Sequence, residues 1–149
     1  MTSIAQNLRA PNTQPLGHAP SSRARDWTAW ILTGIPVLFL LVDGIIKLAR
    51  IKAVTDSLPK FGWPVGLAVP LGILLLSCLA LYVVPRTAAL GAILLTGYLG
   101  GAVATHVRIG DPLFSHVLFP VYIGVMLWGG LYLRDARLRA LIPFRGTNA

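Results

Sequence analysis

The sequence predicts an all-α membrane protein, a bundle of four transmembrane helices formed by one domain. The first observation is composition, since 55% of the 149 residues are hydrophobic and only 12% are charged. A soluble domain usually carries about a quarter charged residues, so this chain has too few to cover a water-exposed surface. The second is a mean hydropathy of +0.70. The third is a series of four long apolar runs, and the length suits one domain.

The four apolar runs cover residues 27–48, 64–84, 87–105 and 112–133. Each approaches the ~20 residues that a helix needs to cross a hydrocarbon core about 30 Å thick. The runs are continuous and not alternating, which favours helices over the strands of a barrel. Lipid also requires each spanning backbone to satisfy its own hydrogen bonds. Because only residues 85–86 separate them, the second and third helices should form a tight antiparallel hairpin.

Prolines mark the expected irregularities in these helices. Pro36, Pro70 and Pro120 fall inside the first, second and fourth runs. Each removes an internal hydrogen bond, which predicts a local kink. Asp111 directly precedes Pro112. This pair is typical of a helix start, with aspartate as the N-cap and proline at the first helical position.

Both ends of the chain are more polar than residues 27–135, which form the predicted four-helix domain. Residues 1–26 are rich in Pro, Ser, Asn, Gln and Arg without an apolar period, and this predicts a disordered cytoplasmic tail. They lack the apolar core of a signal peptide, so the first apolar run should remain as a transmembrane helix. Residues 136–149 form a basic juxtamembrane tail, which we expect to lie on anionic lipid.

The distribution of basic residues predicts the orientation in the membrane. Four spans place both termini on one side, together with eight of the Lys and Arg residues, and leave five on the other side. Basic residues accumulate on the cytoplasmic side, so both termini should be cytoplasmic. The first and third helices then end, and the fourth begins, at the extracytoplasmic face.

Charge and cysteine content argue against two further classes of protein. The net charge is +8 and the isoelectric point is near 10.6. The basic residues flank apolar runs, so anionic lipid headgroups explain them better than nucleic acid does. Cys78 is the single cysteine, which excludes an internal disulfide and a dithiol site within the chain. It is expected to be a small buried hydrophobe.

One set of candidate functional residues lies near the outer end of the first helix. Asp43 and Lys47 are four residues apart and share a helix face, and Arg50 continues that stripe. A charge at the bilayer centre costs on the order of 2.5–3.5 kcal/mol, so Asp43 should face the bundle interior with Lys47 as its partner. An ion pair that only fixes packing and a functional pair are equally compatible with this pattern.

The second set lies where the third and fourth helices meet, between Thr105 and His116. It contains Thr105, His106, Arg108, Ser115 and His116. Small residues at Gly97, Gly101 and Thr105 recur every four positions, which predicts a close approach of this helix to a neighbour. Arg108 extends along the same stripe, whereas His106 should point almost oppositely if the helix stays regular. The two should then face one pocket only if the helix unwinds near Gly110.

The two histidines admit three interpretations. They bracket a turn that could bring them together, and Asp43 or Asp111 could complete a metal site, although two histidines ten positions apart are a weak signal. Proton exchange with a carboxylate is equally open because histidine titrates near neutral pH. The third interpretation is hydrogen bonding that caps the turn. Our prediction is no metal site, and the sequence contains no phosphate loop, nucleophile elbow or zinc-protease motif.

Several segments together resemble the DoxX-like membrane proteins. They are residues 43–48 (DGIIKL), 97–102 (GYLGGA), 105–108 (THVR), 112–116 (PLFSH) and 128–135 (WGGLYLRD). The resemblance extends over about residues 27–139 and implies a four-helix bundle of a bacterial inner membrane. It also implies quinone as a cofactor to consider, since the family takes its name from a subunit linked to thiosulfate and quinone oxidation. Some relatives associate with redox-stress proteins, which implies a redox-protein partner. The lone Cys78 distinguishes the chain from four-helix enzymes that pass electrons from dithiols to quinones.

The expected function is binding of a small lipophilic or anionic ligand, or of a redox partner, at the extracytoplasmic half of the bundle. Asp43 and Lys47 would organise this site. The contacts would come from Thr105, His106, Arg108, Ser115 and His116. The residues themselves predict no cofactor, and they leave open whether the protein is an enzyme or a homo-oligomer. The alternatives are a quinol-linked oxidoreductase subunit, with a histidine taking protons, and a small transporter.

Overall fold

The computed structural model describes residues 22–141, which are almost entirely helical and contain no strand. Residues 1–21 and 142–149 lie outside the described part, and so do most of the predicted N-terminal tail and the end of the basic C-terminal tail. The four long helices are α1 (Ser22–Leu48), α3 (Ala68–Val83), α4 (Ala88–Arg108) and α5 (Phe119–Arg134). Shorter elements complete the chain: α2 (Lys52–Lys60), η1 (Val65–Leu67), η2 (Leu113–Val117) and α6 (Ala136–Leu141).

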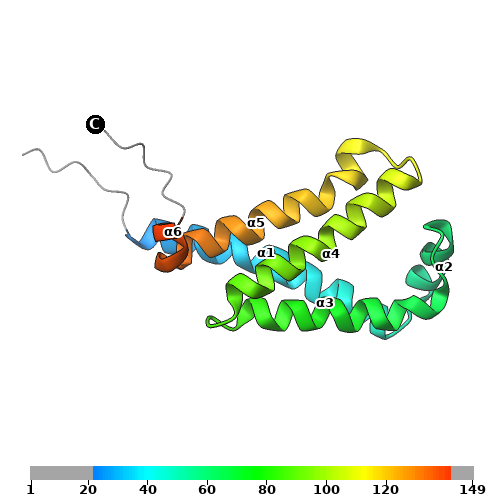
Figure 1. Ribbon diagram of the computed structural model, residues 1–149, viewed down its shortest axis with the longest axis horizontal. Coiled ribbons are helices and arrows are strands. Elements are labelled where there is room, and N and C mark those ends of the chain that lie inside the picture. The colour runs from blue at the N-terminus through cyan, green and yellow to red at the C-terminus, as the bar shows by residue number, and fades with distance from the viewer. Residues whose placement is uncertain (1–21, 142–149) are drawn as a thin grey trace, which may run out of the picture.

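The four long helices form an antiparallel bundle in which each helix packs against two neighbours. α1 contacts α3 and α5, and α4 contacts the same two helices from the other side of the bundle. Helix α6 lies across the end of the bundle at which α1 begins, whereas α2 and the α4–α5 turn lie at the opposite end (Figure 1). This opposite end is the one predicted to be extracytoplasmic, and we call it the outer end.

The exposed surface of the bundle fits a lipid environment. Four helical segments are long and apolar enough to cross a membrane, namely Arg23–Leu48, Val65–Val83, Ala88–Arg108 and Leu113–Arg134. Only 28–33% of the most apolar stretch of each span is buried inside the protein. Large side chains such as Ile35, Ile73 and Ile93 therefore point outward, where water would disfavour them and lipid tails would not. The prediction of an all-α membrane bundle with four spans is confirmed.

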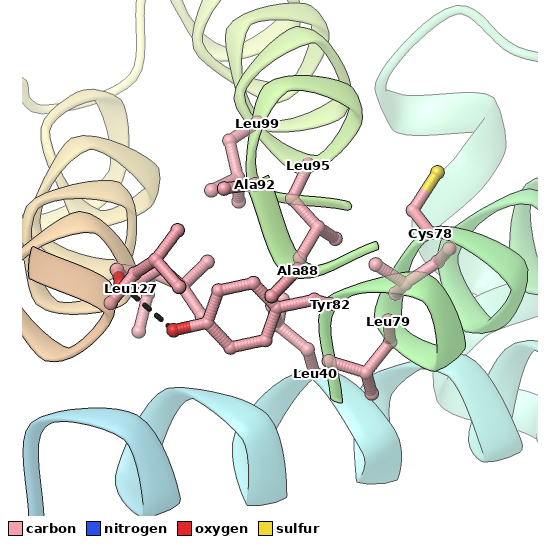
Figure 2. Close-up of a cluster of buried hydrophobic side chains, with 12 residues drawn as sticks. Leu40, Cys78, Leu79, Tyr82, Ala88, Ala92, Leu95, Leu99 and Leu127 are labelled. Atoms are coloured by element: carbon pink, nitrogen blue, oxygen red, sulfur yellow. Dashed lines mark hydrogen bonds between the residues drawn. The ribbon is translucent and has the colours of Figure 1, made fainter. Parts of the chain in front are cut away.

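A leucine-rich core holds the four helices together. Leu40 of α1, Leu75 of α3, Leu95 of α4 and Leu127 of α5 are at most 2% exposed and belong to one cluster. Tyr82 of α3 is fully buried among them, and its hydroxyl donates a hydrogen bond of 2.8 Å to the carbonyl oxygen of Leu127 (Figure 2). Tyr82 therefore links α3 to α5 across the bundle.

Two glycines allow backbones to meet within this bundle. A Cβ atom at Gly91 of α4 would lie 2.2 Å from the backbone nitrogen of Tyr82, which is closer than any real contact. At Gly130 of α5 it would lie 2.4 Å from the hydroxyl of Thr33 and 3.0 Å from its backbone nitrogen. The short α3–α4 hairpin and the α1–α5 packing thus depend on the missing side chains.

The fourth span is divided, which corrects two predictions about its start. Its first part, η2, is a π-helix, in which Val117 and Leu118 donate to carbonyl oxygens five residues earlier. Pro120 therefore lies in the first turn of α5, where its missing N–H breaks no hydrogen bond, instead of in a helix interior. Pro112 occupies the N-cap position of η2, and no side chain caps this helix. The expected N-cap at Asp111 is wrong because that carboxylate is engaged elsewhere.

Helix α2 is a short amphipathic helix between α1 and α3, and it was not predicted from the sequence. Its buried residues Val54 and Leu58 pack around Ala68 of α3, with Ile46 and Leu71 beside them. The spacing of four residues between Val54 and Leu58 was the available signal. Helix α1 also begins at Ser22, before the expected start at residue 27. Helix-forming residues from Arg23 to Arg25 continue it toward the interface.

Three helices at the outer end finish with the same backbone motif. The second residue after the end of each has a positive φ: Arg50 after α1 (50°), Gly62 after α2 (72°) and Gly110 after α4 (74°). The following N–H bonds to a carbonyl five residues earlier, in the pairs Ile51–Ile46, Trp63–Leu58 and Asp111–His106. These bonds define Schellman motifs, which terminate helices and satisfy their last carbonyl groups. The motif after α4 starts the turn that carries the candidate residues.

Candidate functional site

The expected ion pair between Asp43 and Lys47 is present on α1. Lys47 Nζ donates a hydrogen bond to the Asp43 carboxylate, and the side chains of Lys47 and Asp43 are 18% and 26% exposed respectively. The helix faces α3 closely at this level, because a Cβ atom at Gly72 would lie 3.1 Å from both Lys47 Cβ and the Gly44 carbonyl oxygen. The pair is therefore half-buried beside the α1–α3 contact.

Replacing Lys47 by methionine should destabilise the protein because it leaves the Asp43 carboxylate without its cation. We expect a loss of about 2 kcal/mol, less than for a fully buried pair, because both side chains keep some exposure. The double variant Asp43→Asn, Lys47→Met should regain much of this loss. The free energy of unfolding in detergent measures both effects. Equal stability of Lys47→Met and wild type would show that the pair contributes nothing to packing.

A second group of side chains, the turn cluster, lies where the α4–α5 turn meets the loop after α2. It consists of Phe61, His106, Arg108, Asp111 and His116. The Nδ1 atom of His106 lies 2.5 Å from the Asp111 carboxylate. The His106 ring also packs edge-on against Phe61, with centroids 5.3 Å apart, and lies 6.0 Å from the His116 ring. His106 is thus the centre of this cluster, and the engagement of Asp111 explains why it does not cap η2.

Arg108 joins the same cluster from the other side of Phe61. Its guanidinium donates a hydrogen bond to the Phe61 carbonyl oxygen and lies over the Trp63 ring, 5.4 Å from the centroid. A Cβ atom at Gly62 would lie 2.7 Å from this guanidinium, so the glycine leaves room for it. Helix α4 stays regular through Arg108. Arg108 and His106 were expected to face one pocket only if the helix unwound near Gly110. Both nevertheless contact Phe61, because the long arginine side chain reaches the loop that His106 also contacts.

The remaining predicted site residues form local hydrogen bonds. The Ser115 hydroxyl lies 2.7 Å from Nδ1 of His116, and both side chains are exposed. The Thr105 hydroxyl donates to the Gly101 carbonyl oxygen within α4, at 2.9 Å. No hydrogen bond, ion pair or ring contact described within residues 22–141 joins the turn cluster to the Asp43–Lys47 pair. The residues thus form two separate groups at one end of the bundle.

Two other predictions about this region concern a metal site and the small residues of α4. Within residues 22–141, no three His, Cys, Asp or Glu side chains are grouped so that they could hold a metal ion. Gly97 and Gly101 were expected to let α4 approach a neighbour, yet a Cβ atom at either would have nothing within 4 Å in the described chain. The close approach of α4 occurs at Gly91 instead, near the other end of the helix.

A large pocket lies elsewhere, between α4 and α5, and it was not predicted from the sequence. Its volume is about 590 Å³, which is within the usual range for small-molecule sites. Nearly all of its surface is apolar, and its lining includes Gly100 and Val103 of α4, Gly124 and Trp128 of α5, and Leu138 of α6. The glycines in its lining are Gly100 of α4 and Gly124 and Gly129 of α5.

One hydrogen bond fixes an aromatic wall of this α4–α5 pocket. The indole N–H of Trp128 donates to the Thr96 hydroxyl at 2.9 Å, and that hydroxyl donates to the Ala92 carbonyl oxygen at 2.8 Å. Both polar side chains are therefore satisfied, and Trp128 contributes an aromatic side chain to the pocket lining. None of the seven residues predicted from the sequence to form the ligand site lines this pocket.

The match to a known protein family covers most of the bundle. A sequence model of the DoxX-like family matches residues 31–130, two thirds of the chain. The chain belongs to the DoxX-like family. The matched part of this DoxX-like protein includes the Asp43–Lys47 pair, the α4–α5 turn and most of the α4–α5 pocket, and it ends before Tyr132 and α6. Comparison with curated proteins and with solved structures gives no match.

Proposed function

We propose that this DoxX-like protein binds a small lipophilic ligand inside the membrane, in the α4–α5 pocket. The observation that carries the proposal is a pocket of about 590 Å³ with an almost wholly apolar lining in a helix bundle suited to lipid. An apolar cavity of this size is poorly filled by water and favours an apolar occupant. Gly100 leaves open space on the pocket side of α4, since a Cβ atom there meets nothing within 4 Å.

The test is purification in mild detergent followed by native mass spectrometry and identification of bound small molecules. Wild type should carry a lipophilic ligand, and Gly100→Leu should lose most of it because the new side chain fills the pocket. Gly97→Leu is the matched control, since Gly97 lies on the same helix, has equal space and does not line the pocket. A ligand retained equally by wild type and Gly100→Leu would contradict the proposal.

The predicted site residues support a second candidate function, contact with a redox partner or an anionic ligand at the outer end. Exposed Phe114, with 75% of its surface accessible, lies in the same turn as Arg108 and His116. An aromatic side chain beside two potential cations is typical of a contact surface. Arg108→Ala and His116→Ala should weaken such a contact without removing the ligand of the α4–α5 pocket. Unchanged partner binding in both variants would exclude this role.

A quinol-linked oxidoreductase remains an alternative that the geometry favours less. It requires a proton acceptor beside the bound quinol, and neither His106 nor His116 lines the α4–α5 pocket. If the alternative is correct, His106→Ala or His116→Ala should abolish turnover in folded protein. The small transporter has no feature within residues 22–141 that favours it over binding.

We further propose a bacterial inner-membrane location with both termini cytoplasmic. The support is the distribution of basic residues and the position of the start of α1 and of α6 at the same end of the bundle (Figure 1). A reporter enzyme fused to the C-terminus tests this. Activity on the cytoplasmic side agrees with the proposal, and activity on the outer side would reverse the orientation.

A further inference from the structure

The length of the α4–α5 pocket indicates what kind of lipophilic molecule it fits. Along α5 it extends from Pro120 to Tyr132, which corresponds to about 18 Å at 1.5 Å per residue. One leaflet contributes about 15 Å of hydrocarbon, half of the usual 30 Å thickness. The pocket therefore runs parallel to the lipid tails over roughly one leaflet. It ends at α6, near the level where a headgroup would lie.

Three arginines lie close in sequence to Leu138, the residue of α6 that lines the pocket. Leu138 lines the pocket, and Arg137 and Arg139 are its neighbours in α6. Arg139 donates hydrogen bonds to the carbonyl oxygens of Tyr132 and Leu133. Arg134 donates to the Tyr82 carbonyl oxygen at 3.3 Å and lies over its ring. These two guanidinium groups are therefore partly used in holding the helix ends.

Arg137 differs from its neighbours because its side chain is exposed and has no hydrogen bond or ion pair with residues 22–141. The nearest acid in sequence, Asp135, uses its carboxylate to accept from the backbone nitrogens of Arg137 and Leu138 at 2.8 and 3.4 Å. This carboxylate caps α6 and is not paired with the Arg137 guanidinium. An available guanidinium is thus carried by the residue next to Leu138, which lines an apolar pocket about as long as a lipid tail.

We infer that the α4–α5 pocket holds one acyl chain of an anionic glycerophospholipid whose phosphate binds Arg137. The inference rests on the proposed function and names its ligand class. A guanidinium matches a phosphate group with two parallel hydrogen bonds. Three arginines at positions 134, 137 and 139 disfavour the ammonium group of a zwitterionic lipid. A lipid without that ammonium group is therefore preferred.

The fluorescence of Trp128 provides the test, because its indole lines the pocket. The other three tryptophans, Trp27, Trp30 and Trp63, are exposed and are replaced by phenylalanine. The full-length chain is placed in nanodiscs of phosphatidylglycerol and phosphatidylcholine, with brominated acyl chains on one lipid at a time. Quenching of Trp128 then reports which lipid occupies the pocket.

We expect phosphatidylglycerol to be preferred about fivefold, which corresponds to ~1 kcal/mol for one basic residue at an anionic surface. Arg137→Gln should reduce the preference to about one. Arg86→Gln is the control, because Arg86 is also exposed and does not line the pocket. It lies in the α3–α4 hairpin, which is at the same end of the bundle as α6 (Figure 1). The variant should keep the preference. Native mass spectrometry of the chain with all four tryptophans gives the same comparison if the triple replacement fails to fold.

The outcomes separate this inference from the proposed function. Equal quenching by both lipids, reduced by Gly100→Leu but unchanged by Arg137→Gln, would overturn the inference and leave a lipophilic pocket in place. Equal loss of preference in Arg86→Gln and Arg137→Gln would also overturn it, because general surface charge would then explain the selectivity. Quenching that Gly100→Leu does not change would overturn the proposed function as well.

Discussion

Replacement of Gly91 by alanine should cause the largest loss of stability of any single methyl addition in α4. The new Cβ atom would lie 2.2 and 2.5 Å from the backbone nitrogen and Cα of Tyr82. Backbone atoms cannot rotate away as the end of a side chain can, so α3 and α4 must separate. We expect a loss of about 3 kcal/mol or more, at the upper end of the usual cost of overpacking. Unfolding by denaturing detergent, followed by circular dichroism, measures it.

Gly97→Ala is the matched control for this prediction. Gly97 lies in the same helix, and a Cβ atom there meets nothing within 4 Å. The variant should be as stable as wild type or gain up to ~1 kcal/mol from the higher helix propensity of alanine. Equal effects of the two substitutions would contradict the close α3–α4 contact. A strong loss in Gly97→Ala alone would show that this open face packs against something outside the chain.

Truncation of Tyr82 should have the second large effect, and its two parts can be separated. Tyr82→Ala removes a fully buried ring from the core, which we expect to cost about 4 kcal/mol. Tyr82→Phe removes only the hydroxyl that donates to the Leu127 carbonyl oxygen (Figure 2). Side-chain hydrogen bonds between transmembrane helices contribute on average ~0.6 kcal/mol, so the loss should be below about 2 kcal/mol.

The same unfolding measurement serves for both Tyr82 variants. The Arg134 guanidinium also lies over the Tyr82 ring, with its Cζ 4.9 Å from the centroid. Phenylalanine preserves that contact. Tyr82→Phe should therefore stay much closer to wild type than Tyr82→Ala. Equal losses in the two variants would mean that the hydrogen bond, and not packing of the ring, links α3 to α5.

The spans and the Asp43–Lys47 pair could be predicted from the sequence because they depend on local properties. Continuous apolar runs specify a spanning helix, and a spacing of four places Asp43 and Lys47 on one face of any helix. The π-turn of η2 and the fate of Asp111 could not be predicted in this way. Both depend on the contact between His106 and the Asp111 carboxylate. The turn at Gly110, which has a positive φ, brings these two side chains together.

The α4–α5 pocket could not be predicted because a pocket is a property of two helices and their rotation. Periodic small residues were recognised at Gly97 and Gly101, yet the glycines that line the pocket are Gly100, Gly124 and Gly129. A sequence pattern identifies a small residue but does not tell whether its open side faces a helix, a pocket or lipid. Arg108 and His106 illustrate the same limit. Their positions on α4 predict different directions, yet both contact Phe61 because the arginine side chain is long.

The central claim is that a lipophilic molecule occupies the α4–α5 pocket, and intermolecular nuclear Overhauser effects test it most directly. The protein is purified with its own ligand and exchanged into perdeuterated detergent, so that ligand protons are the only external aliphatic signals. We predict cross-peaks from these protons to the Trp128 indole and the Val125 methyl groups, which line the pocket. Ile93 is 58% exposed but does not line the pocket, and it should show none. Cross-peaks absent from Trp128, or equally strong at Ile93, would contradict the claim.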